Sequence, residues 1–314
     1  MVHKMPSYNF VDFHAHPAAE LRRLRNRLQS AGAVASVLYP IDVDPTLSLT
    51  LSGLFRLARD LGVTVDVKSI VREVYELINK WPEYMIDHMK LWYEVFKEGV
   101  SEFFIPFSSI NPSFGSKYVK QKIWEMEHLS LRGVFVSPTL QFFDPARSPA
   151  FKALMEYSEK NEVLVVIHLG MPREVDERLI THVVPGKLSE VLDEYRPDVV
   201  VSGLGTPPER VGVWVREVAR LMRRYDNVYL TTPDLNCYLF STDSGRSLIN
   251  SLGADRVLFG SGYPYRRYSD LIMNVKCVGG SVNIDNGDKD YVMMENAINL
   301  LKTHGFRVSE ALST

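Results

Sequence analysis

The 314-residue sequence predicts an α/β fold, a (β/α)8 TIM barrel that residues 1–314 form as a single domain. Short apolar runs rich in β-branched residues alternate with segments of helical spacing, and their near-continuous hydrophobicity is typical of parallel strands buried on both faces. Such a pattern leads to a closed barrel or a doubly wound sheet. The eight runs are Asn9–His14, Ala33–Leu38, Phe103–Phe107, Gly133–Val136, Val163–His168, Val199–Val201, Val228–Leu230 and Val257–Gly260. Eight strands favour the barrel.

Helical patterns separate these runs and are long enough to return the chain to the start of the next strand. They cover Ala18–Ala31, Phe151–Lys160, Lys187–Tyr195 and Glu209–Tyr225. Residues 41–99 differ, because they contain three further helical patterns, Leu49–Leu61, Val67–Asn79 and Pro82–Lys97. We expect a helical insertion between strands two and three. A cap over the barrel mouth is favoured over a dimer contact, since insertions in barrels follow the strands beside the site.

Composition narrows the classes of partner and the compartment. The net charge is -2 and no block of like charges occurs, so nucleic-acid binding is not expected. No apolar stretch reaches the roughly 18 residues of a membrane span, and no signal-peptide pattern opens the chain. The two cysteines, Cys237 and Cys277, have no Cys-x-x-Cys spacing, so neither a disulfide framework nor a thiolate zinc site is suggested. A reducing, cytoplasmic environment follows from these observations.

Three histidines end predicted strands. Asp12, His14 and His16 alternate along the first strand, so strand geometry sends them to one side, the barrel interior. His168 ends the fifth strand at the same rim. Imidazole is a common zinc ligand, and barrel active sites lie at the carboxyl ends of the strands. Three imidazoles predict a zinc site that leaves a position for water, whose pKa the ion lowers to about 7. Hydrogen-bonded core histidines are the alternative.

Seven motifs occur in order along nearly the whole chain. They are Val11–Pro17, Ser109–Pro112, Leu131–Val134, Ile167–Gly170, Asn227–Leu230, Ala254–Ser261 and Glu295–Leu301. Together they resemble the amidohydrolase superfamily, in the amidohydrolase 2 branch that includes carboxymuconate-semialdehyde decarboxylase-like enzymes. The resemblance implies a metal held by the strand-one pair, the strand-five histidine and a strand-eight aspartate. It also implies a strand-six histidine that acts as acid/base or polarises a carbonyl.

The sequence departs from that family pattern at two positions. Gly262 stands where the strand-eight motif usually has aspartate, and Gly203 stands where strand six usually has histidine. Glycine can neither bind a metal nor accept a proton, and loss of a positioned general base typically lowers the rate by about 10² to 10⁴. The two missing side chains are also expected to enlarge the pocket.

Four other groups could supply the missing base from loops at the barrel mouth. Asp234 follows strand seven and His182 follows strand five, and these two are the predicted substitutes. Asp42 and Asp44 follow strand two and could also point into the mouth. For each of them, an ordinary loop position is the alternative.

Cationic side chains follow the same strands. Arg173 follows His168, while Arg266 and Arg267 follow strand eight. Arg173 and Arg266 are predicted to bind a carboxylate on a small-molecule substrate, with surface solvation as the alternative. The expected function is a metal-dependent hydrolase that uses metal-activated water, or a related decarboxylase. A catalytically degenerate barrel that serves as a binding or scaffold protein is the second hypothesis, and a homo-oligomer is left open.

Overall fold

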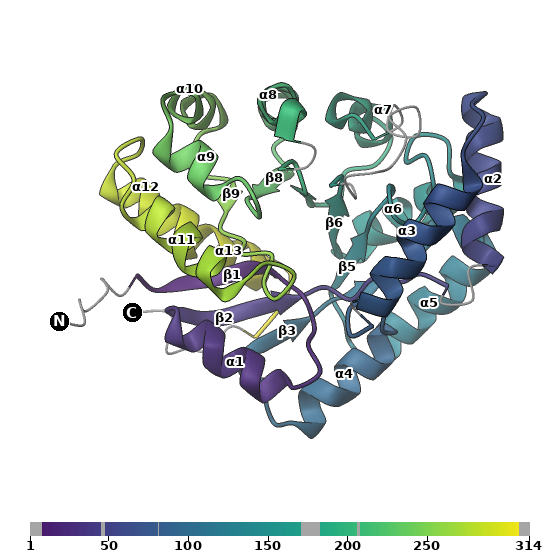
Figure 1. Ribbon diagram of the computed structural model, residues 1–314, viewed down its shortest axis with the longest axis horizontal. Coiled ribbons are helices and arrows are strands. Elements are labelled where there is room, and N and C mark those ends of the chain that lie inside the picture. Colours follow the sequence, from purple (N-terminus) through teal and green to yellow (C-terminus); the bar gives the residue numbers. More distant parts are fainter. Residues whose placement is uncertain (1–7, 45–47, 81, 171–182, 206–207, 308–314) are drawn as a thin grey trace.

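The computed structural model describes residues 8–44, 48–80, 82–170, 183–205 and 208–307, and its strands follow the predicted runs closely (Figure 1). They are β1 (Phe10–Ala15), β2 (Ala33–Leu38), β3 (Phe104–Pro106), β4 (Ser108–Ser109), β5 (Gly133–Val136), β6 (Leu164–His168), β7 (Val199–Ser202), β8 (Val228–Thr231) and β9 (Val257–Leu258). The third predicted strand, Phe103–Phe107, corresponds to β3, and the short β4 follows just beyond its predicted end. All pairs of neighbouring strands are parallel.

Hydrogen bonds outside the regular ladders close the barrel. The Phe107 amide donates to the Leu38 carbonyl at 3.0 Å, which continues the β2–β3 sheet toward β4. Across the seam between β1 and β9, the Phe13 amide donates to the Phe259 carbonyl at 2.8 Å. Beyond the end of β9, the Gly262 amide donates to the His14 carbonyl at 2.8 Å. The predicted α/β barrel is therefore confirmed.

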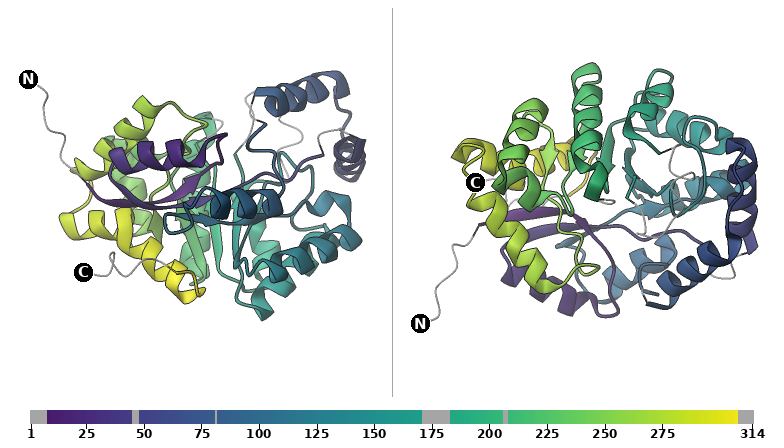
Figure 2. Two further views of the ribbon diagram at one scale, coloured as in Figure 1. Left: turned by 90° about the horizontal axis from the view of Figure 1, so that it is seen from below. Right: turned by 45° about the horizontal axis from the view of Figure 1, so that its top comes forward.

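The helices surround the strands (Figure 2). The α-helices are α1 (Leu21–Ser30), α2 (Ser48–Leu61), α3 (Val67–Lys80), α4 (His88–Lys97), α5 (Ser116–His128), α6 (Pro149–Lys160), α7 (Ser189–Leu192), α8 (Val211–Arg224), α9 (Asn236–Ser241), α10 (Asp243–Leu252), α11 (Tyr268–Gly279), α12 (Asn286–Asp290) and α13 (Asn296–Thr303). Short 3₁₀ turns are η1 (Pro112–Phe114), η3 (Pro185–Leu188) and η4 (Pro208–Arg210), and a π turn, η5, spans Tyr291–Glu295.

Capping groups explain where several helices begin. The Ser148 hydroxyl accepts the Phe151 amide at 3.2 Å, and Pro149 occupies the first turn of α6. The first turn of α1 is capped from a distance, because the Glu98 carboxylate accepts the amides of Leu21 and Arg22 at 3.3 and 2.9 Å. The helix predicted from Ala18 therefore begins three residues later than expected.

Alternate residues of β6 pack into two different hydrophobic clusters, and this alternation shows to which side of the strand His168 points. Val165 and Ile167 belong to the cluster that contains the apolar faces of α6 and α8. Leu164 and Val166 belong instead to a cluster of strand residues that α13 joins. This second cluster lies away from the outer helices, inside the barrel. His168 continues the alternation of Leu164 and Val166 and so ends β6 on the inner side.

The segment between β2 and β3 divides into two parts. Leu91 and Val95 of α4 are buried in the outer cluster with the barrel helices. By contrast, α2 and α3 share a small core with Phe142, which follows β5. They lie to one side of the strands in both views (Figures 1 and 2). Among the described residues, no helix is both long and apolar enough to span a bilayer.

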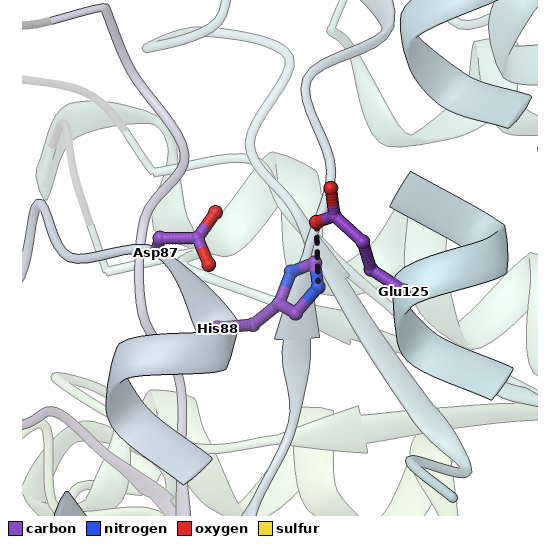
Figure 3. Close-up of side chains that lie close together, drawn as sticks. All are labelled: Asp87, His88 and Glu125. Carbon is purple, nitrogen blue, oxygen red and sulfur yellow. Dashed lines mark ion pairs between the residues drawn. The ribbon is translucent and has the colours of Figure 1, made fainter. Parts of the chain in front are cut away.

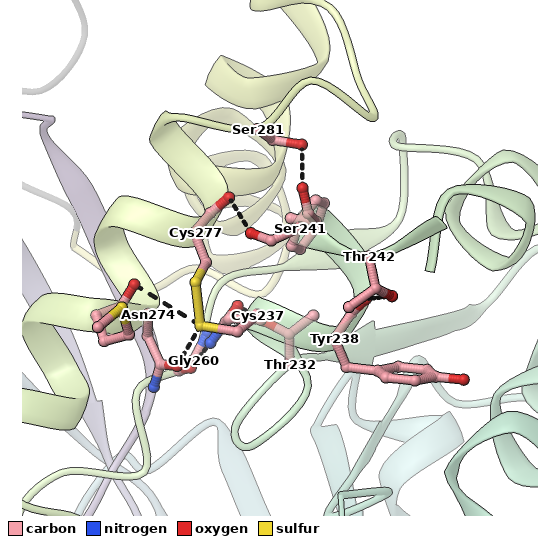
Figure 4. Close-up of a disulfide and its surroundings, with 12 residues drawn as sticks. Thr232, Cys237, Tyr238, Ser241, Thr242, Gly260, Asn274, Cys277 and Ser281 are labelled. Atoms are coloured by element: carbon pink, nitrogen blue, oxygen red, sulfur yellow. Dashed lines mark hydrogen bonds between the residues drawn. A yellow bond between two sulfur atoms is a disulfide. The ribbon is translucent and has the colours of Figure 1, made fainter. Parts of the chain in front are cut away.

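A disulfide joins Cys237 of α9 to Cys277 of α11, with their Cα atoms 4.9 Å apart (Figure 4). The sequence suggested no disulfide framework, and the bridge corrects that expectation. The residues are 40 positions apart in sequence, and the packing of α9 against α11 brings them together. Cys-x-x-Cys spacing identifies only cysteines that are close together in the sequence. The expectation of a reducing compartment rested partly on these cysteines and loses that support.

Candidate functional site

The three predicted histidines meet inside the barrel at the carboxyl ends of β1 and β6. The ring centroid of His14 lies 5.0 Å from that of His16 and 5.6 Å from that of His168. His14 Nδ1 is 3.0 Å from the Ser202 hydroxyl. His16 Nδ1 is 3.0 Å from the Tyr39 carbonyl, which can only accept, so this nitrogen carries the proton and Nε2 keeps a lone pair. His168 Nδ1 is buried and has no hydrogen-bond partner within the described part of the chain.

Burial keeps these imidazoles neutral. It lowers the pKa of His16 to about 4 and that of His168 to about 3, and it holds the pKa of His14 well below the usual range. Electrostatic interactions with His16 and His168 lower the pKa of His14 further. Neutral imidazole is the form that binds metals, so the site provides three donors at neutral pH without loss of a proton.

Asp12 is buried next to the histidines and is held by Ser261, which follows β9. The Ser261 hydroxyl and amide donate to the carboxylate at 2.5 and 2.9 Å, and the His14 amide donates at 3.2 Å. Burial raises the pKa of Asp12 to about 7, although these hydrogen bonds favour the charged form. Asp12 thus ties β1 to the loop after β9 and positions the backbone of His14.

Aromatic side chains line the histidine cluster. The Tyr39 ring lies 4.9 Å from His14 and stacks on Phe135 at the same centroid distance. Tyr84, from the loop between α3 and α4, places its buried ring 5.0 Å from His16. The segment between β2 and β3 therefore contributes a wall of the site. Sequence reasoning did not identify Tyr84, because a single tyrosine within a helical pattern carries no signal of its position.

Asp234 and Arg266 lie together at the mouth as an ion pair. The guanidinium donates two parallel hydrogen bonds of 2.7 Å to the two carboxylate oxygens. Asp234 adopts a left-handed backbone conformation with φ +65°. Its charge raises the pKa of His16 against the larger effect of burial, so the carboxylate is within electrostatic reach of that imidazole. The structure thus joins the predicted base and a predicted substrate-binding cation.

The two family-atypical glycines have different surroundings. Gly203 has φ +77°, and a Cβ there would lie 2.8 Å from Gly170 Cα and 2.8 Å from His168 Cε1. Gly262 has φ +67°, and a Cβ there would meet only Pro233 and Arg266 atoms at 3.6 and 3.7 Å. The expected pocket enlargement is therefore wrong at Gly203, because Gly170 and His168 fill that space.

The other predicted residues have separate outcomes. His182 and Arg173 lie outside the described residues. Asp42 is partly buried and accepts hydrogen bonds from the Asn111 amide at 2.9 Å and the Tyr118 hydroxyl at 2.7 Å. Burial raises its pKa to about 6, and its contacts tie the loop after β2 to α5 rather than to the three histidines.

Asp44 and Arg267 complete this set. Asp44 is also buried. The Arg267 amide donates a hydrogen bond to the Asp270 carboxylate at 3.1 Å, which places Arg267 at the start of α11.

The nitrogen donors of His14, His16 and His168 fit a divalent metal, but their ligand atoms do not all lie within 4.8 Å of one another. Within the described ranges, the group found with ligand atoms within 4.8 Å of one another is Asp87, His88 and Glu125, between α4 and α5 (Figure 3). In their present positions, the three barrel-mouth histidines are not among the described groups that meet this distance. Sequence reasoning missed the second group, because Glu125 is far from Asp87 and His88 along the chain.

A closed parallel barrel with buried neutral imidazoles at the carboxyl ends of its strands defines a TIM-barrel protein with a candidate metal centre. The comparisons with known proteins agree with this class. The profile of the amidohydrolase family matches residues 90–302, about two thirds of the chain. The chain therefore belongs to the amidohydrolase family, which contains hydrolases and decarboxylases and is typically metal-dependent. A comparison with curated proteins gives no match.

Solved structures show the same fold at low sequence identity. An uncharacterised TIM-barrel protein of Bordetella bronchiseptica is 18% identical, with a TM-score of 0.66 over 95% of this chain and 100% of that chain. The 5-carboxyvanillate decarboxylase of Sphingomonas paucimobilis is 14% identical, with a TM-score of 0.61 over 94% and 99%. A 2,6-dihydroxybenzoate decarboxylase from Rhizobium is 14% identical, with a TM-score of 0.53 over 94% and 98%.

Proposed function

We propose that this protein is a metal-dependent hydrolase, or a carbon–carbon lyase of decarboxylase type, that acts on a small carboxylate-bearing molecule. The observation that carries the proposal is the cluster of three neutral imidazoles at the carboxyl ends of β1 and β6, with His14 and His16 buried and His168 partly buried. His168 is central, since its buried Nδ1 has no hydrogen-bond partner among the residues that the structure describes. A buried polar atom without a partner costs about 1–3 kcal/mol, and a bound metal would remove that cost.

His14, His16 and His168 would hold the metal, and zinc suits an all-imidazole donor set. The Tyr39 carbonyl fixes the tautomer of His16 that leaves Nε2 available, as partners of metal-bound histidines commonly do. When bound, the ion would supply Lewis-acid polarisation of a substrate oxygen or of water.

Asp234 and Arg266 would provide the polar part of the substrate site. The Arg266 guanidinium matches the geometry of a carboxylate, and Asp234 now occupies it. A substrate carboxylate that takes this place would release Asp234 beside His16, where it could accept a proton in place of the aspartate missing at Gly262. Tyr84 would close the site from the side of α2 and α3, so we extend the proposal to a capping role for this helical segment.

Metal content tests the proposal. Purified wild-type protein is expected to bind one divalent ion per chain at the histidines, and His168→Ala is expected to lose it by elemental analysis. His128→Ala is the matched control, because His128 is exposed on α5 and its ring contacts Trp124. Folded His168→Ala that keeps the metal content of the control would contradict the proposal.

Turnover gives the second arm of the test. The metal-loaded protein is offered small aromatic and aliphatic carboxylates and their esters, while carbon dioxide and acid release are measured. Arg266→Met is expected to raise KM for carboxylate substrates, because it removes the matching cation, whereas Arg267→Met serves as the control. Equal KM values for the two variants would exclude the role of Arg266.

A second candidate is a binding or scaffold protein that has lost catalysis. The close approach of Gly170 to Gly203 favours it, because the present backbone leaves no space for a side chain at position 203. This candidate predicts that carboxylates bind, as calorimetry would show, without turnover in the metal-loaded protein. Turnover that disappears in His168→Ala would rule it out.

A further inference from the structure

We propose a second divalent-cation site outside the barrel, formed by Asp87, His88 and Glu125 between α4 and α5, where the Lys122 ammonium now lies. Each of the three residues offers a ligand atom, and these atoms lie within 4.8 Å of one another (Figure 3). The barrel-mouth histidines come from strands, whereas these residues come from the outer helices and the residue before α4. The two sites therefore bind independently, and the second does not depend on the proposed function.

His88 is the residue that points to a missing cation. Its Nδ1 lies 3.3 Å from the Ser109 carbonyl, which can only accept, so Nδ1 carries the proton. In the neutral ring, Nε2 then keeps a lone pair, yet among the described residues this buried atom has no hydrogen-bond partner, and it faces Glu125 Oε2 at 3.5 Å. Two acceptors facing each other in a buried place favour a positive ion between them.

The local charges also favour an additional cation. Asp87 and Glu125 both pair with the Lys122 ammonium, the latter at 2.7 Å. The Asp42 carboxylate interacts electrostatically with both Lys122 and Asp87. With His88 neutral, one ammonium thus faces three carboxyl groups. A divalent ion would balance this group better than the single charge of lysine.

Access to the site is through Asp87. Its side chain is 42% exposed, whereas those of Lys122 and Glu125 are each 9% exposed. An ion from solvent can thus reach one carboxylate first, and the flexible lysine stem allows the ammonium to move aside. Two carboxylates and one imidazole are a donor set that zinc, manganese and cobalt accept. We therefore infer that Lys122 and the metal compete for the same two carboxylates.

Cobalt titration of the full-length protein tests this competition, because visible absorbance reports the ligands of the bound ion. Lys122→Met removes the competitor and nearly conserves side-chain volume. It is expected to bind an ion at this site at least about tenfold more tightly than wild type, a change of about 1.4 kcal/mol. Adding His88→Gln to Lys122→Met is expected to remove that gain. Lys120→Met, on the exposed side of α5, is the control.

Two results would overturn the proposal. The first is cobalt affinity in folded Lys122→Met equal to that of wild type and Lys120→Met. The second is a gain in Lys122→Met that persists after His88→Gln. If Lys122→Met does not fold, His88→Gln introduced into His168→Ala decides. The proposal requires this double variant to bind cobalt more weakly than His168→Ala, and equal binding refutes it.

Discussion

Removal of the Cys237–Cys277 disulfide is expected to lower the free energy of unfolding by about 4 kcal/mol. The bridge closes a loop of 40 residues and so restricts the unfolded chain. For a loop of about 40 residues, the chain-entropy relation gives about 13 cal/mol/K, which is about 4 kcal/mol at 25 °C. A loss of this size is a large part of the roughly 5–15 kcal/mol that stabilises an ordinary domain.

The perturbation is the double variant Cys237→Ser/Cys277→Ser, compared with wild type by urea unfolding with and without dithiothreitol. Wild type in reductant is expected to unfold like the double variant, while the variant is expected to be insensitive to reductant. Ser241→Ala is the local control, because Ser241 on α9 donates a hydrogen bond to the Cys277 carbonyl without taking part in the bridge. Its effect is expected to stay within about 0.5 kcal/mol.

The reasoning is refuted if the double variant and wild type differ by less than the Ser241→Ala control. It is also refuted if non-reduced wild type, once unfolded, titrates with two free thiols. The first result would mean that the loop does not limit the unfolded chain, and the second that the bridge does not form.

Two further predictions concern backbone space and pH. Gly262→Ala is expected to lower the free energy of unfolding by about 1–2 kcal/mol, because alanine is strained in the left-handed backbone. Gly203→Ala is expected to lower it by more than about 3 kcal/mol, because its Cβ also collides with Gly170. Equal midpoints in urea unfolding would contradict this difference. Burial alone would lower the pKa of His304, but its bonds to Asp198 and to the Glu162 carbonyl raise it above 6.5. The stabilisation by His304 is thus present in full below pH 6.5 and is lost as pH rises through the raised pKa. His304→Gln is expected to destabilise the protein more at pH 5.5 than at pH 8.5, and an equal loss at both would refute the assignment.

Short-range patterns were sufficient to predict the barrel and the three histidines. A strand buried on both faces is a continuous apolar run, so the sequence from Val163 to His168 is sufficient to predict β6. Its alternation then gives the direction of His168, and the same argument places His14. Both are consequences of local backbone geometry, which neighbouring residues determine.

The remaining features depend on packing between elements that are distant in sequence. The sequence alone placed Asp234 and Arg266 near the rim, but only the tertiary structure pairs them through loops after β8 and β9. The Cys237–Cys277 bridge likewise requires α9 to pack against α11. Such contacts depend on how helices and loops pack around the closed barrel, and sequence periodicity carries no information about that packing. The sequence therefore determined the strands and the side chains that they present, and the tertiary structure decided which partners those side chains meet.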